Sequence, residues 1–181
     1  SDLIKYSKDS LFYIGEFRSG KFFGNGIKLG IVTIYVGQFK DDYINGYGYL
    51  YGLSDSSLFE KNLEYLIRNK LDLIKPTKNI VKEYSGFFSD IDKPKELRLI
   101  NGSITNYIVD TATNNLRYTI KRSGKFKGES LVEKGTLEID FVNFGEIKSG
   151  KFIYYGNVEG MPKGPAVCLA FDEKNQMVTK Y

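Results

Sequence analysis

A glycine- and aromatic-rich segment that recurs with a period of 22 residues constrains this chain more than any other feature. Residues 13–26 read YIGEFRSGKFFGNG and residues 35–48 read YVGQFKDDYINGYG, and the two segments align without a gap. A fixed period of this length is typical of one supersecondary unit that stacks on its neighbours. The sequence therefore predicts a repeat array.

The spacing inside each unit predicts a β-hairpin. Tyr13, Gly15 and Phe17 alternate along a first strand and share one face of it, and Gly24 and Gly26 share one face of a second strand. Glycine has no side chain, so these positions leave bare backbone on which aromatic rings can lie. The equivalent structural positions of the second unit are Tyr35, Gly37, Phe39, Gly46 and Gly48. In the turn, Asp42 stands where the first unit has Gly20. The sequence Lys-Asp-Asp still favours a turn, because Asp is a common turn residue.

Weaker copies of the unit follow over residues 84–169. They are YSGFF at 84–88, RSGKFKGESLVEKGTL at 122–137, NFGEIKSGKFIYYG at 143–156 and YGNVEGMPKGPAV at 155–167. Residues 88–120 alternate between apolar and polar, with Asn101-Gly102 and Asn114-Asn115 as turn signals, which indicates further strands. The expected fold is mainly β, an elongated antiparallel sheet of hairpins in one domain over residues 1–181, with clear repeats at 13–52.

One helical insertion, at about residues 53–83, interrupts the expected hairpins. Ser57 and Glu60 form a capping-box pattern, and Pro76 ends the segment. The apolar positions at helical spacing are Phe59, Leu63, Leu66, Ile67, Leu71 and Ile74. We expect an amphipathic helix over 57–75, which either covers one face of the sheet or docks a partner.

Composition argues against most catalytic and metal chemistry. The chain has no His, which removes the commonest general base and metal ligand, and its one cysteine, Cys168, lies in an apolar context typical of a buried, inert thiol. The carboxylates Glu138, Asp140 and Glu146 are scattered through strand-like sequence. We therefore expect no enzyme activity, no catalytic residues, no metal and no cofactor. The formal net charge of +4 makes no case for nucleic acid.

The sequence has no apolar run long enough to span a bilayer, and its first residues do not resemble a signal peptide. We expect a cytoplasmic protein, with association with a membrane or the cytoskeleton as an alternative. Because the chain begins without Met, it could be a fragment of a longer protein.

Tyrosines at alternate positions form the first candidate partner-binding site. Tyr43, Tyr47, Tyr49 and Tyr51 line the strand face opposite Gly46 and Gly48, and Tyr154 and Tyr155 form a second, weaker candidate. One interpretation is cross-strand packing under the helix. The other is a surface that binds a partner protein, because tyrosine is enriched at interfaces.

Four basic residues form the second candidate site: Lys121, Arg122, Lys125 and Lys127. If this segment is extended, its three lysines share one face and could bind acidic lipid headgroups or an acidic peptide. A solvated surface strand is the alternative, because Glu129 and Glu133 follow at once.

The two opening units resemble MORN repeats, which are hairpins with Tyr-x-Gly, an aromatic two positions on, and Gly-x-Gly in the second strand. By this resemblance the aligned Tyr, Gly and Phe positions are structural, and none is catalytic. The resemblance implies a non-catalytic scaffold or interaction module that assembles with another protein, copies of itself included. The alternatives are a peripheral module that binds acidic phospholipid and a regulatory repeat domain of a larger enzyme.

Overall fold

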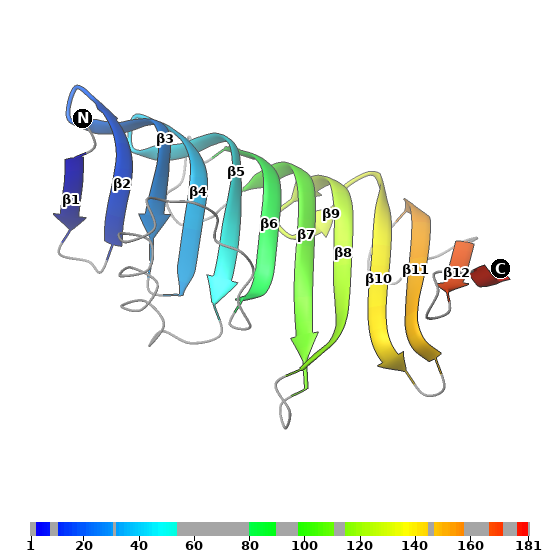
Figure 1. Cartoon of the computed structure of the whole chain (residues 1–181). Helices are drawn as coiled ribbons and strands as arrows, with labels where there is room; N and C mark the ends of the chain where they lie inside the picture. Colours follow the sequence, from blue (N-terminus) through cyan, green and yellow to red (C-terminus); the bar gives the residue numbers. More distant parts are fainter. Residues whose placement is uncertain are drawn as a thin grey trace. The chain divides into compact units, whose positions relative to one another are not determined.

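The computed structural model describes residues 3–7, 11–30, 32–53, 80–89, 98–110, 115–144, 147–157, 167–171 and 177–180. In these residues every regular element is a β-strand, and the strands of each hairpin pair antiparallel (Figure 1). The chain divides into two compact units, Ser1–Leu97 and Arg98–Tyr181, which are described in turn. The predicted mainly β, antiparallel fold is confirmed.

The first unit contains the two clear repeats. Its strands are β1 (Leu3–Ser7), β2 (Leu11–Arg18), β3 (Lys21–Leu29), β4 (Thr33–Lys40), β5 (Tyr43–Leu53) and β6 (Ile80–Ser89). Each strand pairs antiparallel with the next. The hairpins β2–β3 and β4–β5 coincide with the two aligned segments of the sequence.

The second unit continues the antiparallel pattern. Its strands are β7 (Leu99–Val109), β8 (Leu116–Lys127), β9 (Ser130–Leu131), β10 (Lys134–Phe144), β11 (Ile147–Asn157), β12 (Val167–Phe171) and β13 (Met177–Lys180). The pairs follow chain order from β7 to β13, except that β8 pairs with both β10 and the short β9.

The prediction of a turn at Asn101-Gly102 is wrong. Both residues lie inside β7, and Gly102 pairs directly with Gly124 of β8. The turn lies later, between β7 and β8, where the Asp110 amide donates to the Asn115 carbonyl at 2.8 Å. A glycine that looks like a turn signal serves here as a strand position.

The predicted helix over 57–75 lies outside the described residues. Its expected flanks can be placed, because β5 ends at Leu53 and β6 begins at Ile80. Residues 80–83, which were assigned to the insertion, are therefore strand.

Both clear hairpins close through turns whose central residues have left-handed backbone angles. Ser19 and Gly20 have φ of 53° and 76°, and Asp41 and Asp42 have φ of 53° and 75°. Two successive positive φ values are the mark of a type I′ hairpin turn. The Asp42 carboxylate also accepts a 2.8 Å hydrogen bond from the Phe22 amide. Asp42 thus replaces Gly20 and ties its turn to the preceding hairpin.

Five glycines, one from each strand from β2 to β6, pair directly with one another, and we call them the glycine row. They are Gly15, Gly26, Gly37, Gly48 and Gly86. A Cβ placed at Gly15 would lie 2.5 Å from the Tyr13 hydroxyl oxygen, and one at Gly48 would lie 2.5 Å from that of Tyr35. The two rings therefore lie on bare backbone, as the sequence predicts.

Burial and hydrogen bonding fix these two tyrosines. Both are almost fully buried, and their hydroxyls donate to the carbonyls of Glu16 at 3.0 Å and Gln38 at 3.2 Å. Desolvation, followed by the charge of Glu16, raises the pKa of Tyr13 to about 12, and desolvation also raises the pKa of Tyr35. Both phenols are therefore neutral at physiological pH.

Aromatic rings connect the tyrosines into the core of the first unit. Tyr13 stacks on Phe22 with centroids 3.8 Å apart. Phe39 meets Tyr13 and Tyr35 edge to face, at 5.0 and 5.2 Å, and Phe88 meets Tyr35 at 5.5 Å. Edge-to-face pairs contribute about 0.5–1.5 kcal/mol beyond the area they bury. Phe17 joins the cluster at 5.2 Å from Tyr13.

Gly24 and Gly46 require a correction, because they do not make room for rings. A Cβ at Gly24 would lie 2.5 Å from the Glu16 carboxylate, and one at Gly46 would collide with the Gln38 side chain. Their φ angles of 63° and 120° are left-handed, which favours glycine. Here Glu16 Oε1 and Gln38 Oε1 each accept a 2.9 Å hydrogen bond from a backbone amide, of Asn25 and Tyr47 respectively.

The second unit keeps paired glycines, and at Gly124 the side chain that covers them is no longer aromatic. Gly102 pairs with Gly124, and Gly135 pairs with Gly156. A Cβ at Gly124 would lie 2.8 Å from the Leu131 side chain, so a leucine from β9 lies where a ring lies in the first unit.

We expect Gly48→Ala to destabilise the fold by about 1–3 kcal/mol, because the new methyl group would overlap the Tyr35 ring. The matched control is Gly52→Ala on the same strand, where a Cβ would lie 3.4 Å from its nearest neighbour. This change should stay within about 0.5 kcal/mol. Urea unfolding of both variants measures the difference. Equal losses of stability would contradict the role given to Gly48.

Candidate interaction surface

The strand face opposite the glycine row carries a group of exposed rings. Tyr47 is 69% exposed and Tyr49 is 50% exposed, and Tyr43 and Phe87 are also exposed. Tyr47 and Phe87 are direct cross-strand partners whose rings meet edge to face at 5.4 Å. We call Tyr43, Tyr47, Tyr49 and Phe87 the tyrosine surface. Phe87 was not among the sequence candidates, because only the register of β6 places it beside Tyr47.

Tyr51 shares the alternation of these residues but not their exposure. It is 8% exposed, and its ring stacks on Tyr49 with centroids 6.3 Å apart. Desolvation, followed by the charge of Glu83, raises the pKa of Tyr51 to about 12. Its direct strand partner Ile34 is buried as well. The structure therefore places Tyr51 in the interior, at the end of the tyrosine row.

The second pair of candidates is split in the same way. Tyr154 is almost fully buried, with its hydroxyl oxygen 2.5 Å from where a Cβ of Gly156 would lie, whereas Tyr155 is 69% exposed. Tyr154 thus stands in the Tyr-x-Gly position, like Tyr13 before Gly15. Only Tyr155 is accessible to a partner.

Hydrogen bonding distinguishes Tyr13 and Tyr35 from the exposed tyrosines. The hydroxyls of Tyr13 and Tyr35 both donate to backbone carbonyls. In the part of the chain that the structure describes, the hydroxyls of Tyr43, Tyr47 and Tyr49 make no hydrogen bond. These three phenols can therefore bond to water or to a partner.

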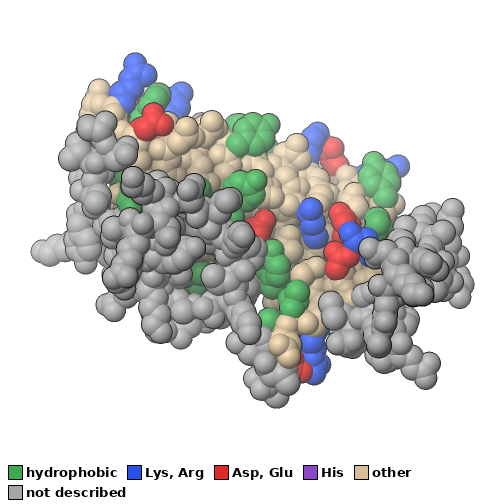
Figure 2. All heavy atoms as spheres, in the orientation of Figure 1, with side chains coloured by type: hydrophobic (Ala, Val, Ile, Leu, Met, Phe, Trp, Pro, Cys, Tyr) green, Lys and Arg blue, Asp and Glu red, His purple; other side chains and the backbone are tan. Residues whose placement is uncertain are grey.

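Acidic groups lie among the residues of the predicted basic face. Lys125 forms a 3.0 Å ion pair with Glu133, and Lys121 lies directly opposite Glu138 on β10. Arg122 pairs with Leu137 in the register, so it points to the other face, and its guanidinium donates to the Glu129 carbonyl at 3.2 Å. Lys127 is exposed. On the face seen in Figure 2, acidic side chains lie beside basic ones, and hydrophobic side chains form separate patches.

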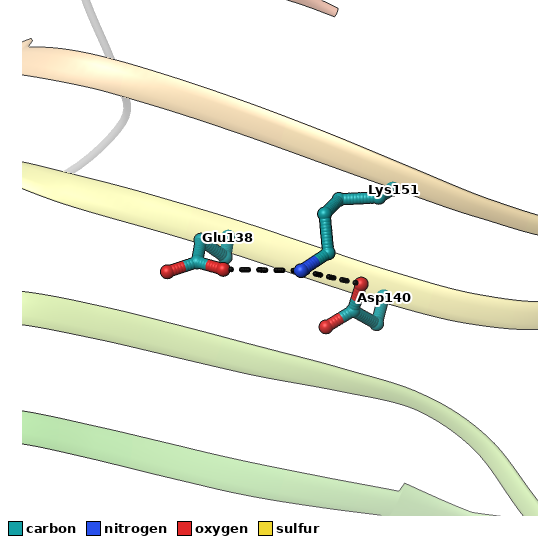
Figure 3. A network of polar contacts seen from close by, with 3 residues as sticks. All are labelled: Glu138, Asp140 and Lys151. Carbon is teal, nitrogen blue, oxygen red and sulfur yellow. Dashed lines mark hydrogen bonds and ion pairs between the residues drawn. The ribbon is translucent and has the colours of Figure 1, made fainter. Parts of the chain in front are cut away.

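Two of the three carboxylates that seemed scattered in the sequence meet at a lysine, and the third, Glu146, lies outside the described residues. Lys151 Nζ lies 3.3 Å from Glu138 and 3.4 Å from Asp140 (Figure 3). Partial burial acts to lower the pKa of Lys151, but the hydrogen bonds and charges of the two carboxylates raise it overall. This arrangement is a cross-strand ion-pair network, which the sequence could not reveal without the register of β10 and β11.

The described residues hold no group of three or more His, Cys, Asp or Glu side chains close enough to bind a metal ion. Nor do they contain a helix with the length and apolar character needed to cross a bilayer. Cys168 lies on β12, but its side chain is outside the described residues, so its expected burial stays a prediction.

No protein-family model matches the chain, and no curated protein is significantly similar to it. The MORN resemblance accordingly stays a hypothesis that rests on the Tyr-x-Gly units and on the hairpins that they form.

The burial of Tyr51 predicts a loss of stability at alkaline pH. Its folded pKa of about 12 is above the ordinary value of 10.0, so its contribution is complete below pH 10 and is lost as the pH rises toward 12. Tyr51→Phe should therefore reduce the fall in unfolding free energy over this range. Urea unfolding at several pH values measures the effect. An identical pH dependence in the variant would place Tyr51 outside the interior.

Proposed function

We propose that this protein is a non-catalytic interaction module that binds another protein through the tyrosine surface. The observation that carries the proposal is the exposure of Tyr47, Tyr49 and Phe87 on a strand face, while the opposite face buries its own tyrosines against glycine. The finer assignment, an elongated MORN-like array with one helical insertion that works as a cytoplasmic scaffold, is part of this proposal.

Exposed rings on a regular strand are well suited to binding. Tyrosine brings a large contact area with few rotatable bonds, so little entropy is lost when a partner covers it. The contact between Tyr47 and Phe87 limits ring motion further before binding. Where such an aromatic residue is a hot spot at the centre of an interface, its truncation to alanine reduces the binding free energy by about 2 kcal/mol or more.

Two other functions have less support. An acidic phospholipid would have to compete with Glu133 for Lys125, and it would meet Glu138 directly opposite Lys121. A regulatory domain of a larger enzyme would use the same tyrosine surface against a catalytic domain of its own chain, and only the length of the intact gene distinguishes that case.

Tyr47→Ser combined with Tyr49→Ser should abolish partner capture and leave the fold intact. We expect at least a tenfold loss of the proteins retained from native lysate, because a tenfold change needs only about 1.4 kcal/mol. The unfolding free energy should change little, because both side chains are exposed. Quantitative mass spectrometry of the retained proteins, with a melt of each variant, measures both effects.

Tyr155→Ser is the matched control, since Tyr155 is as exposed as Tyr47 but lies in the second unit. It should retain the same proteins as the unmodified chain. Unchanged capture by the double variant would refute the proposal. A large loss of stability in the double variant would show instead that the tyrosines belong to the core.

A further inference from the structure

The centre of the tyrosine surface is uncharged. Along β5 and β6, Tyr47 pairs with Phe87, Tyr49 pairs with Ser85, and Asn45 pairs with Ser89. Charged residues pair with the tyrosine row only at its two ends. They are Lys40, opposite Tyr43, and Glu83, opposite Tyr51. A charged partner segment would lose its hydration here without meeting an opposite charge.

The surface offers side-chain donors but no free strand edge. The backbone of β5 is paired with β4 on one side and with β6 on the other, so a partner cannot join as a further strand at this point. The hydroxyls of Tyr43, Tyr47 and Tyr49, which make no hydrogen bond within the described residues, are available to donate. A suitable partner segment is therefore uncharged and partly apolar, and it has more hydrogen-bond acceptors than hydrogen-bond donors.

We propose that the tyrosine surface binds a proline-rich segment in the polyproline II conformation, an inference that rests on the proposed function of this surface. Proline has no backbone N–H, so such a segment presents carbonyl acceptors without unmatched donors. Polyproline II has no internal hydrogen bonds, which leaves its carbonyls free to accept from phenols. Its pyrrolidine rings pack on aromatic faces, as in other modules that recognise proline-rich peptides.

Rigidity on both sides favours this partner over a flexible one. Polyproline II is preformed in the free peptide, so little conformational entropy is lost on binding. Tyr47 is held against Phe87, and Tyr49 against the buried Tyr51, before any partner arrives. An acidic peptide meets no opposite charge at the uncharged centre.

The test is an NMR titration of the full ¹⁵N-labelled chain with a deca-proline peptide. Gly-Ser, oligo-glutamate and oligo-lysine peptides of equal length serve as controls. We expect deca-proline alone to shift the amide signals of β5 and β6 around Tyr47, Tyr49 and Phe87. Tyr47→Ser with Tyr49→Ser should weaken this binding about tenfold or more, and Tyr155→Ser should leave it unchanged.

The pair Tyr47→Phe and Tyr49→Phe separates ring stacking from hydrogen bonding. It keeps both rings, so we expect weakened binding rather than none. Absence of deca-proline binding, or equal or stronger binding of any control peptide, would overturn the inference. If deca-proline fails while Tyr47→Ser with Tyr49→Ser still abolishes capture of cellular proteins, only the proline inference fails. If capture also persists, the proposed function fails with it.

Discussion

The contact of a tyrosine ring with paired glycines is the constraint on which the first unit depends. Tyr13 and Tyr35 can be buried only because the strands beneath them present no Cβ at Gly15, Gly26, Gly37 and Gly48. The rings of both tyrosines then meet Phe39 edge to face, and each hydroxyl is satisfied by a carbonyl three residues ahead. One sequence pattern thus supplies the bare backbone, the ring packing and the hydrogen bond of the phenol. This explains why the pattern is repeated.

This constraint also gives the two faces of the first unit different chemistry. The glycine row lets one face bury its aromatic rings, so tyrosine on the opposite face is not needed for that cluster. Tyr47 and Tyr49 lie on this opposite face with exposed rings. Exposed tyrosine rings are therefore concentrated on the face that the aromatic core does not use, and contiguous exposed apolar surface often marks a binding site. The contrast between the faces supports the proposed interaction surface.

The repeat predicted most of the fold, because its signals are local. Hairpin spacing, the presence of the turns and the contact of Tyr13 with Gly15 all follow from residues close together in the chain. Features that depend on distant residues were not predictable: Gly102 reads as a turn until its pairing with Gly124 is known. Alternation likewise placed Tyr49 and Tyr51 on one face, but it could not show that only Tyr51 is buried. The register across strands decides both outcomes.

A double-mutant cycle between Tyr13 and Gly26 tests the central claim most directly. The three atoms nearest to a Cβ at Gly26 all belong to Tyr13, so the methyl group of Gly26→Ala should conflict first with that ring. Unfolding free energies would be measured for Gly26→Ala, Tyr13→Leu and the double variant. We predict that alanine destabilises much less in the leucine background, with a coupling of at least about 0.5 kcal/mol. Additive effects of the two changes would contradict the account.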